Sequence, residues 1–241
     1  MRIYNKKAIF AFSSIILVNP AYSNEADDHS NFPNKPITVV VPYSAGGHTD
    51  LITRTIASEV EDYLGQSFNV KNTTGGGGTI ALTEVYQANP DGYTLAMGTS
   101  GPMTIKPHSG TPYSYDSFAP VILATDVPLG LAVSADAPYD DFEEWLDWVK
   151  ANPGEFEYGT PGAGLTQHVS MQSLQRKIGD VEVTHIPFDG GAPAMTAVLG
   201  DHINGVYLQL TELRPHIESG EFKLLAVSGR ERAKDFPDTP N

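Results

Sequence analysis

The chain has 241 residues, of which 40% are hydrophobic and 18% are charged, a balance typical of globular proteins rather than disordered or fibrous ones. Its formal net charge of -14 argues against nucleic acid as a partner, because affinity for nucleic acid depends on Lys and Arg that neutralise phosphates. The chain contains no cysteine, which excludes disulfides, thiolate metal sites and lipid attachment through a lipobox.

The N-terminal segment has the pattern of a signal peptide. Basic residues precede an apolar run over residues 8–18, and Ala21 and Ser23 form the small-x-small pattern of a cleavage site. The apolar run is too short to span a hydrocarbon core of about 30 Å as a helix. We therefore expect residues 1–23 to be removed, the mature chain to begin near Asn24, and the protein to reach the bacterial periplasm without a lipid anchor. Because residues 1–23 carry three basic and no acidic side chains, their removal shifts the net charge from -14 to -17.

The rest of the chain alternates apolar strand candidates with amphipathic helix candidates. The strand candidates cover residues 37–41, 68–71, 93–97, 156–159, 181–187, 203–208 and 223–228. The helix candidates cover residues 51–64, 80–87, 141–150, 167–177, 194–199 and 210–218. Two further apolar runs, residues 119–125 and 129–133, lie where the chain could pass from one domain to another. This alternation predicts an α/β fold with parallel strands and right-handed crossovers.

Glycine-rich loops follow several of the strand candidates. They cover residues 42–50, 72–79, 160–166 and 188–193. Glycine lets the backbone approach a ligand closely, and the helix that follows each loop offers first-turn N–H groups without partners. In open parallel sheets, ligands lie beyond the carboxyl ends of the strands. We therefore expect at least two of these loops to line a cleft for a small, anionic ligand.

Motifs for catalysis and cofactor binding are missing from these loops. No Gly-Lys-Ser or Gly-Lys-Thr follows a glycine run, and no loop has the dinucleotide-binding spacing. Ser100 does not stand in the Gly-x-Ser-x-Gly elbow of serine hydrolases, which favours a hydroxyl that lines a loop or caps a helix. The histidines form no His-x-x-x-His pair of the kind that metal sites use. We expect neither a cofactor nor a metal.

Some loop residues allow both a structural and a functional interpretation. His48 and His168 each lie where a loop becomes a helix, so either could donate a hydrogen bond to a carboxylate or be solvated. Asp50 could contact a ligand, or it could complement the helix dipole and pair with Arg54 four residues later. Two aromatic residues that begin loops could wall a ligand or belong to the core, namely Tyr43 and Phe188.

Six segments, taken together and in order, resemble one family. They are PYSAGGHTD at 42–50, Asn72 with the glycine run after it, NPDGYTL at 89–95, YSYDSFAPV at 113–121, YGTPGAGLTQH at 158–168 and HIPFDGG at 185–191. The segment KLLAVSGRER at 223–232 continues the match. Over nearly all of residues 33–240 the chain resembles the solute receptors of tripartite tricarboxylate transporters, also called Bug proteins.

This resemblance implies a bilobed type II periplasmic-binding-protein fold, with two mixed or parallel sheets flanked by helices and a ligand cleft between the lobes. It implies that lobe I comprises residues 33–125 and 225–241, and that lobe II comprises residues 126–224. It also implies a monomeric, non-enzymatic receptor that captures a small di- or tricarboxylate, or a related acid, and delivers it to membrane permease subunits.

Carried onto this chain residue by residue, the family's ligand loops imply a set of candidate binding residues. In lobe I these are Tyr43, Ser44, Ala45, Gly46, Gly47, His48, Thr49, Asp50, Thr99 and Ser100. In lobe II they are Thr160, Gly162, Ala163, Gly164, Thr166, His168, Phe188, Asp189 and Gly190. Backbone donors and helix N-termini can neutralise an anion without Arg or Lys, which fits this set.

The chain departs from the family pattern in three places. His48 stands where the family usually has Pro or a small residue. Asp189 stands where a basic residue is common, so it would disfavour a second ligand carboxylate and suit a hydroxyl or ammonium group. Family members also continue for roughly another 50 residues, a length within the normal range of such domains, so we expect this chain to be truncated and lobe I to be incomplete.

Two rival interpretations remain open. One is an exported hydrolase or isomerase on the same fold, with Ser100 or His168 as its catalytic group. The other is a nonfunctional remnant, because truncation would leave apolar surface of lobe I exposed and the fold marginally stable.

Overall fold

The computed structural model describes residues 31–179 and 181–241 of the chain. The signal peptide expected at residues 1–23 lies outside the described residues. The strands are β1 (Ile37–Val41), β2 (Phe68–Asn72), β3 (Thr94–Ala96), β4 (Leu129–Ser134), β5 (Glu157–Thr160), β6 (Thr184–Pro187), β7 (Gly205–Gln209) and β8 (Phe222–Val227). The α-helices are α1 (His48–Leu64), α2 (Thr79–Gln87), α3 (Phe142–Ala151), α4 (Thr166–Lys177), α5 (Gly191–Leu199) and α6 (Leu210–Glu218).

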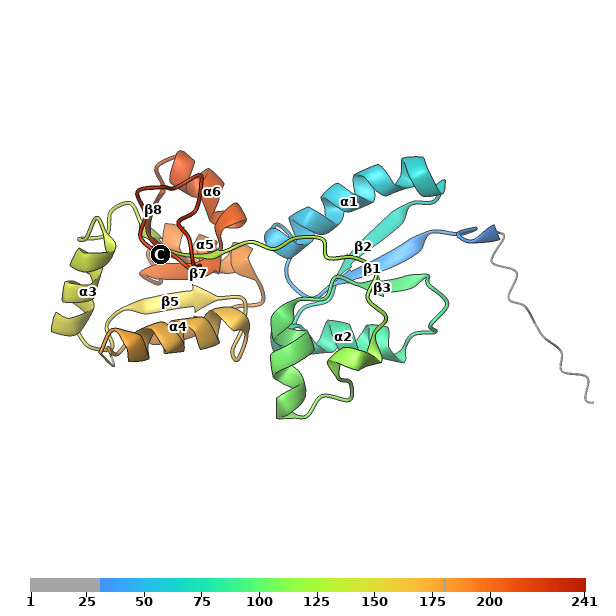
Figure 1. Cartoon of the computed structure of the whole chain (residues 1–241), viewed down its shortest axis with the longest axis horizontal. Helices are drawn as coiled ribbons and strands as arrows, with labels where there is room; N and C mark the ends of the chain where they lie inside the picture. The colour runs from blue at the N-terminus through green and yellow to red at the C-terminus, as the bar shows by residue number, and fades with distance from the viewer. Residues whose placement is uncertain (1–30, 180) are drawn as a thin grey trace, which may run out of the picture. The chain divides into compact units, whose positions relative to one another are not determined.

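The first sheet has three parallel strands in the order β2-β1-β3. Helices α1 and α2 cover its opposite faces (Figure 1). The central strand β1 is rich in Ile and Val and is largely buried, and Val40 and Val41 have no exposed surface, as is typical of a parallel strand covered on both faces. Helix α1 ends at Gly65, which adopts the left-handed conformation with φ 64° and donates its N–H to Glu61 O.

The second sheet has the strand order β6-β5-β7-β4-β8 and is mixed. Strand β5 runs parallel to β6 and β7, whereas β4 runs antiparallel to both β7 and β8. Alternate residues of β4 and β7 enter two different apolar cores. One core contains Leu131, Tyr207 and Trp145 of α3, and the other contains Ala132, Leu208 and residues of α5. The strict alternation of side chains along a strand therefore fixes this register, with helices packed on both faces.

The fold class expected from the sequence is confirmed, because the chain forms two sheets flanked by helices. The return of the chain to lobe I was expected at residue 225. Leu225 lies inside β8, which pairs with β4 of the second sheet. Beyond this strand, Val227 N–H donates to Pro240 O, so the segment after β8 also returns to the end of this strand.

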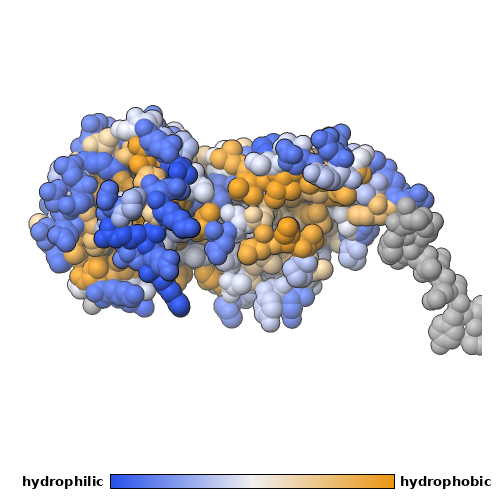
Figure 2. Space-filling view, turned by 45° about the horizontal axis from the view of Figure 1, so that its top comes forward, coloured by the Kyte–Doolittle hydropathy of each residue, from blue (hydrophilic) through white to orange (hydrophobic). Residues whose placement is uncertain are grey.

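The apolar run 119–125 does not form a strand. Residues 119–128 have no regular structure, and the side chains of Val121, Ile122 and Leu123 are about 80% exposed. Figure 2 shows apolar surface over the part of the chain that carries the first sheet. None of the described helices combines the length and the apolar character needed to cross a membrane.

Candidate functional site

The loop between β1 and α1 is shaped by Asp50. One carboxylate oxygen of Asp50 accepts the N–H of Gly46 and the Nε–H of Arg54, each at 2.9 Å, and the other accepts Nδ2–H of Asn72 at 2.9 Å. Burial alone would raise the pKa of Asp50, but the bonds from Arg54, Gly46 and Asn72 outweigh it and place the pKa below the usual value. Asp50 and Arg54 therefore form the side-chain pair that their spacing of four residues allows.

Tyr43 links the ends of two neighbouring strands of the first sheet. Its hydroxyl lies 2.9 Å from Thr99 Oγ1, which follows β3. Asn72, at the end of β2, donates through Nδ2 to Tyr43 O at 3.0 Å. Burial raises the pKa of Tyr43 to about 12, so this hydroxyl keeps its proton at neutral pH. The carboxyl ends of all three strands of the first sheet are thus tied together beneath the loop.

Thr160, the last residue of β5, fixes the carboxyl end of that strand in the second sheet. It is fully buried, its hydroxyl lies 2.7 Å from His185 Nε2, and its carbonyl accepts the N–H of Phe188 at 2.9 Å. Its hydroxyl also lies 3.3 Å from the N–H of Gly162, which donates to it. Thr160 therefore fixes the first residues of one glycine loop against the strand that leads to the other.

His168 and His185 form a stacked pair behind this loop. Their ring centroids are 4.0 Å apart with an interplanar angle of 12°. His168 Nδ1 accepts the N–H of Gly164 at 3.0 Å, which leaves the ring in the role of an acceptor. Burial lowers the pKa of both imidazoles, and the neighbouring His168 lowers that of His185 further, to about 4. Both rings are therefore neutral at neutral pH.

Residues 33–241 form one compact unit, and loops from its two sheets touch. Ser44 N–H donates to Asp189 O at 2.8 Å, and Ser100 Oγ lies 2.8 Å from Thr166 Oγ1. A side chain at Gly190, whose φ is +158°, would meet Ser44 Oγ and would lie 3.0 Å from Ser44 N. This position therefore requires glycine because of the close approach of the two backbones.

His48 makes a second contact of this kind with the start of α6. Its backbone N–H donates to Glu212 Oε2 at 3.1 Å, and its ring Nδ1 lies 2.6 Å from Thr211 Oγ1. His48 is buried, and burial lowers its pKa below the usual value. His48, one of the two residues that depart from the family pattern, therefore connects the first turn of α1 to the first turn of α6 through hydrogen bonds.

Glu212, like Thr211, was not indicated by the glycine-loop pattern. Its side chain is 4% exposed, and burial raises its pKa to about 7, partly offset by the N–H groups of His48 and Gln209. With Gln209 it forms a capping box at the start of α6, where Gln209 N–H donates to Glu212 Oε1 at 3.3 Å. The sequence feature that could have indicated Glu212 is an acidic residue three positions after β7, in a strand–helix junction that contains no glycine.

A cavity of about 10 Å³ lies between these elements, about the space that one water molecule needs. Its lining comprises Tyr43, Gly47, His48, Thr49, Pro161, Gly191, Gln209 and Glu212. Tyr43, Gly47, His48 and Thr49 were candidates from the sequence, and Pro161 and Gly191 lie in two of the predicted glycine loops, whereas Gln209 and Glu212 lie outside these loops.

Other candidates lie beside the cavity or away from it. Ser44, Thr99, Ser100, Thr160, Gly162, Thr166, His168 and Gly190 take part in the loop contacts and strand ends described above. Ala45, Gly46, Ala163 and Asp189 are exposed, while Gly164 and Phe188 are half-buried. The exposed side chain of Asp189 is not part of the cavity lining, so only its backbone enters the contact between loops.

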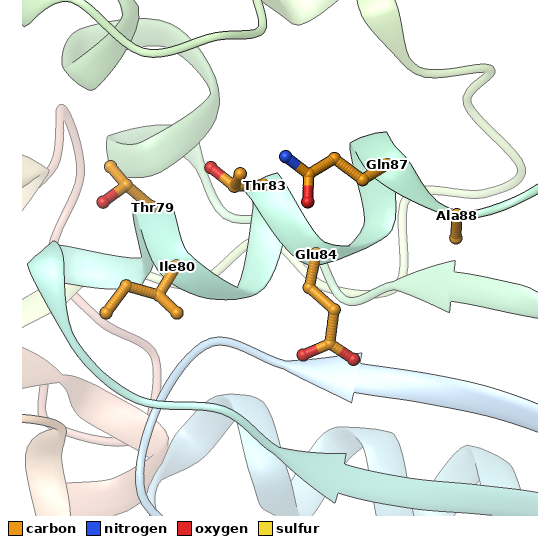
Figure 3. Close-up of a pocket in the computed structure, with 6 residues that line it drawn as sticks. All are labelled: Thr79, Ile80, Thr83, Glu84, Gln87 and Ala88. Atoms are coloured by element: carbon orange, nitrogen blue, oxygen red, sulfur yellow. The ribbon is translucent and has the colours of Figure 1, made fainter.

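A larger hollow of about 450 Å³ lies along α2, and all the residues that line it come from α2 or directly follow it (Figure 3). They are Thr79, Ile80, Thr83, Glu84, Gln87 and Ala88. Its charged residue, Glu84, is acidic and engages Lys71 at 2.7 Å. This hollow offers an organic anion no basic side chain, so we do not assign the ligand to it.

Ser100 and His168 make their contacts with groups of the neighbouring loops. Residues 31–179 and 181–241 contain no group of three or more His, Cys, Asp or Glu side chains arranged to hold a metal ion. Ser100 bonds to Thr166 rather than to a histidine, and His168 accepts a backbone N–H. A serine nucleophile needs an adjacent base, which these contacts do not supply.

The sequence matches the family model described as the tripartite tricarboxylate transporter family receptor over residues 52–241. The chain belongs to this receptor family. A relative in Bordetella pertussis, a UPF0065 protein, is 33% identical over 94% of this chain and 69% of its own length. Another relative, in Cupriavidus necator, is 36% identical over 87% of this chain and 64% of its own length. The chain thus spans about two thirds of the length of these relatives.

Solved structures of the receptor family have the same fold. MatC of Rhodopseudomonas palustris, determined with bound malate, matches with a TM-score of 0.80 and 32% identity, over 87% of this chain and 72% of that one. A second R. palustris protein, determined with adipate, matches with a TM-score of 0.81 and 30% identity, over 87% and 71% of the two chains. Malate and adipate, the ligands in those two structures, are both dicarboxylates.

Proposed function

We propose that this chain is a periplasmic receptor that captures a small organic dicarboxylate or a related acid for a tripartite tricarboxylate transporter. The observation that carries the proposal is the meeting of helix N-termini around one buried carboxylate, that of Glu212, at the contact between His48 of α1 and Gly191 of α5. Such N-termini bind carboxylates through backbone donors and the helix dipole. The family and the two dicarboxylate complexes support the same ligand class.

The loops around the cavity supply donors of the right kind. Ser44 Oγ is buried and has no hydrogen-bond partner among the described residues, so it is available to a ligand oxygen. The hydroxyls of Ser100 and Thr166 come from opposite sides of the loop contact. Hydroxyls and backbone N–H groups suit a hydroxy acid such as malate, whose oxygens are mainly acceptors at neutral pH.

The remaining parts of the proposal follow from the receptor role. The two sheets act as lobes that separate to admit the ligand and close over it, with residues 119–128 as one connection between them. The protein acts as a monomer, delivers its ligand to permease subunits in the membrane, and performs no chemistry on it. Export depends on the leader at residues 1–23.

A thermal-shift screen with malate, succinate, adipate and citrate tests the ligand class. A ligand at a hundred times its Kd stabilises the folded state by about 2.7 kcal/mol, which raises Tm by roughly 5–10 °C for a chain of this size. The neutral diol 1,4-butanediol is the control and leaves Tm unchanged. If no acid in the panel raises Tm, the proposed function is wrong.

The same samples separate the receptor from an exported hydrolase or isomerase. A receptor returns each acid unchanged after prolonged incubation, as followed by NMR of the ligand. Conversion of any acid by the wild-type protein, lost in the Ser100→Ala or His168→Ala variant, would support the enzyme instead.

A further inference from the structure

The carboxylate of Glu212 lies where three helices begin. Its Oε2 accepts the N–H of His48, the first residue of α1, at 3.1 Å. Its Oε1 accepts the N–H of Gln209, which directly precedes α6. The first residue of α5, Gly191, packs so closely that an added Cβ would lie 2.7 Å from Glu212 Cδ and 2.8 Å from Oε1. Each of these helix starts presents backbone N–H groups and positive dipole ends.

No basic side chain neutralises this carboxylate. Among residues 31–179 and 181–241, none of the ion pairs involves Glu212. Two other titratable residues line the same cavity, His48 and Tyr43; burial lowers the pKa of the His48 imidazole and raises that of the Tyr43 hydroxyl, so both are neutral at neutral pH. The backbone donors of helix starts therefore hold Glu212 alone, as they would hold the carboxylate of a bound acid.

The space around Glu212 leaves no room for such an acid. The cavity that Glu212 lines with Tyr43 and Pro161 measures about 10 Å³, about the volume for one water. An organic dicarboxylate is several times larger than a water molecule, so it cannot enter while the side chain of Glu212 keeps this position. The side chain must turn away, or the loops must separate, before a ligand carboxylate reaches the N–H of His48.

We propose that Glu212 is an internal competitor of the ligand, because its carboxylate occupies the donors between α1, α5 and α6 that a ligand carboxylate would otherwise use. This inference rests on the proposed function and deepens it. In the ligand-free protein the carboxylate of Glu212 holds the starts of α1 and α5 next to the start of α6, as a ligand carboxylate would. A dicarboxylate binds only when it displaces Glu212, and the displaced negative charge stays close to it. Glu212 therefore lowers the affinity for dianionic ligands.

Isothermal titration with malate and with adipate at pH 7.5 tests this role in the whole chain. The Glu212→Ala variant removes the competing carboxylate, and Glu212→Gln removes its charge while keeping its shape. Each variant is expected to bind both acids at least ten-fold more tightly than the wild type. The matched control is Glu218→Gln, on the same helix, whose side chain is 61% exposed and pairs with Arg214. That variant binds as the wild type does.

The outcomes separate this inference from the proposed function. If the wild type binds an acid and either Glu212 variant binds it with equal or weaker affinity, Glu212 is not a competitor and the receptor function stands. If only the variants bind, both proposals are supported. If neither the wild type nor the variants bind, the receptor function fails and the inference fails with it. Far-UV circular dichroism and a cooperative melt establish that each variant folds, and Glu212→Gln serves where Glu212→Ala does not.

A ligand with an ammonium group gives the opposite result. A buried carboxylate without a basic partner could also pair with the ammonium of an amino acid. In that case aspartate binds the wild type more tightly than malate does, and Glu212→Gln weakens aspartate binding at least ten-fold. This outcome would overturn the competitor role and assign Glu212 to direct recognition.

Discussion

The imidazole of His48 lies 2.6 Å from the hydroxyl of Thr211 through Nδ1, although the two residues are 163 positions apart in the chain. Because the backbone N–H of His48 also donates to Glu212, one residue makes both contacts between the start of α1 and the start of α6. Each contact therefore joins the helix that follows β1 of the first sheet to the helix that follows β7 of the second sheet.

A double-mutant cycle on His48 and Thr211 measures the first of these contacts. A hydrogen bond between side chains contributes about 0.5–1.5 kcal/mol. We expect His48→Ala and Thr211→Val each to lower the free energy of unfolding in urea, and the double variant to lose less than the sum of the two by about that amount. Additive losses would mean that the two side chains do not interact in solution.

Asp50 and Asp189 allow a matched comparison of two loop acids. Asp50→Asn removes a charge that Arg54, Gly46 and Asn72 all donate to, and hydrogen bonds to charged groups contribute roughly 1.5–3 kcal/mol each. We expect a loss of about 2 kcal/mol or more in chemical denaturation. Asp189→Asn changes an exposed side chain and is expected to alter stability by less than about 0.5 kcal/mol. Equal effects at both positions would contradict the role of Asp50 in the loop.

The sequence predicts the individual elements around the contact between His48 and Thr211 but not the contact itself. The positions of α1 and β1 could be predicted because Val40 and Val41 form a buried strand and glycines mark both the loop and the end of the helix. The contact of His48 with Thr211 could not be predicted, because the sequence pattern around each residue explains its own strand–helix unit and gives no sign of the other. Only the packing of strands from both halves of the chain brings the two residues together.

The site residues missed by the sequence analysis have a common cause. Glycine loops were taken as the sign of ligand contact, whereas β7 passes into α6 through Gln209 without any glycine. Glu212 in the first turn of α6 has the pattern of an ordinary capping box, so its burial against His48 was not visible. The sheet to which Leu225 belongs could not be predicted for a similar reason. The apolar pattern of Leu225 is that of a strand in either sheet.

Gly191 tests the packing around Glu212 without changing a polar group. A Cβ at Gly191 would overlap the carboxylate of Glu212, so we expect Gly191→Ala to lower Tm and the free energy of unfolding by about 1–3 kcal/mol. In the Glu212→Ala background that space is free, so the same substitution at Gly191 is expected to cost much less there. An equal cost in both backgrounds, measured by differential scanning calorimetry, would show that the carboxylate does not lie against Gly191.

The buried carboxyl of Glu212 also makes stability depend on pH. Its pKa is raised from 4.5 to about 7, so between these values the folded state binds more protons than the unfolded state. Stability contributed in this way is present at low pH and falls by up to about 3 kcal/mol as pH rises through 7. Unfolding of the wild type and of Glu212→Gln should therefore diverge from pH 4.5 to pH 8, with the wild type losing more. Parallel curves would contradict the raised pKa.

His185 acts in the opposite direction and in a different pH range. Its pKa is lowered from 6.5 to about 4, so between these values the unfolded state binds more protons and stability falls as pH decreases. In an NMR titration of the imidazole protons we expect His185 to titrate below pH 5. Because the charge of His168 contributes to this shift, the His168→Ala variant should move the titration of His185 upward. A midpoint near 6.5 in the wild type would mean that His185 is not held neutral between Thr160 and His168.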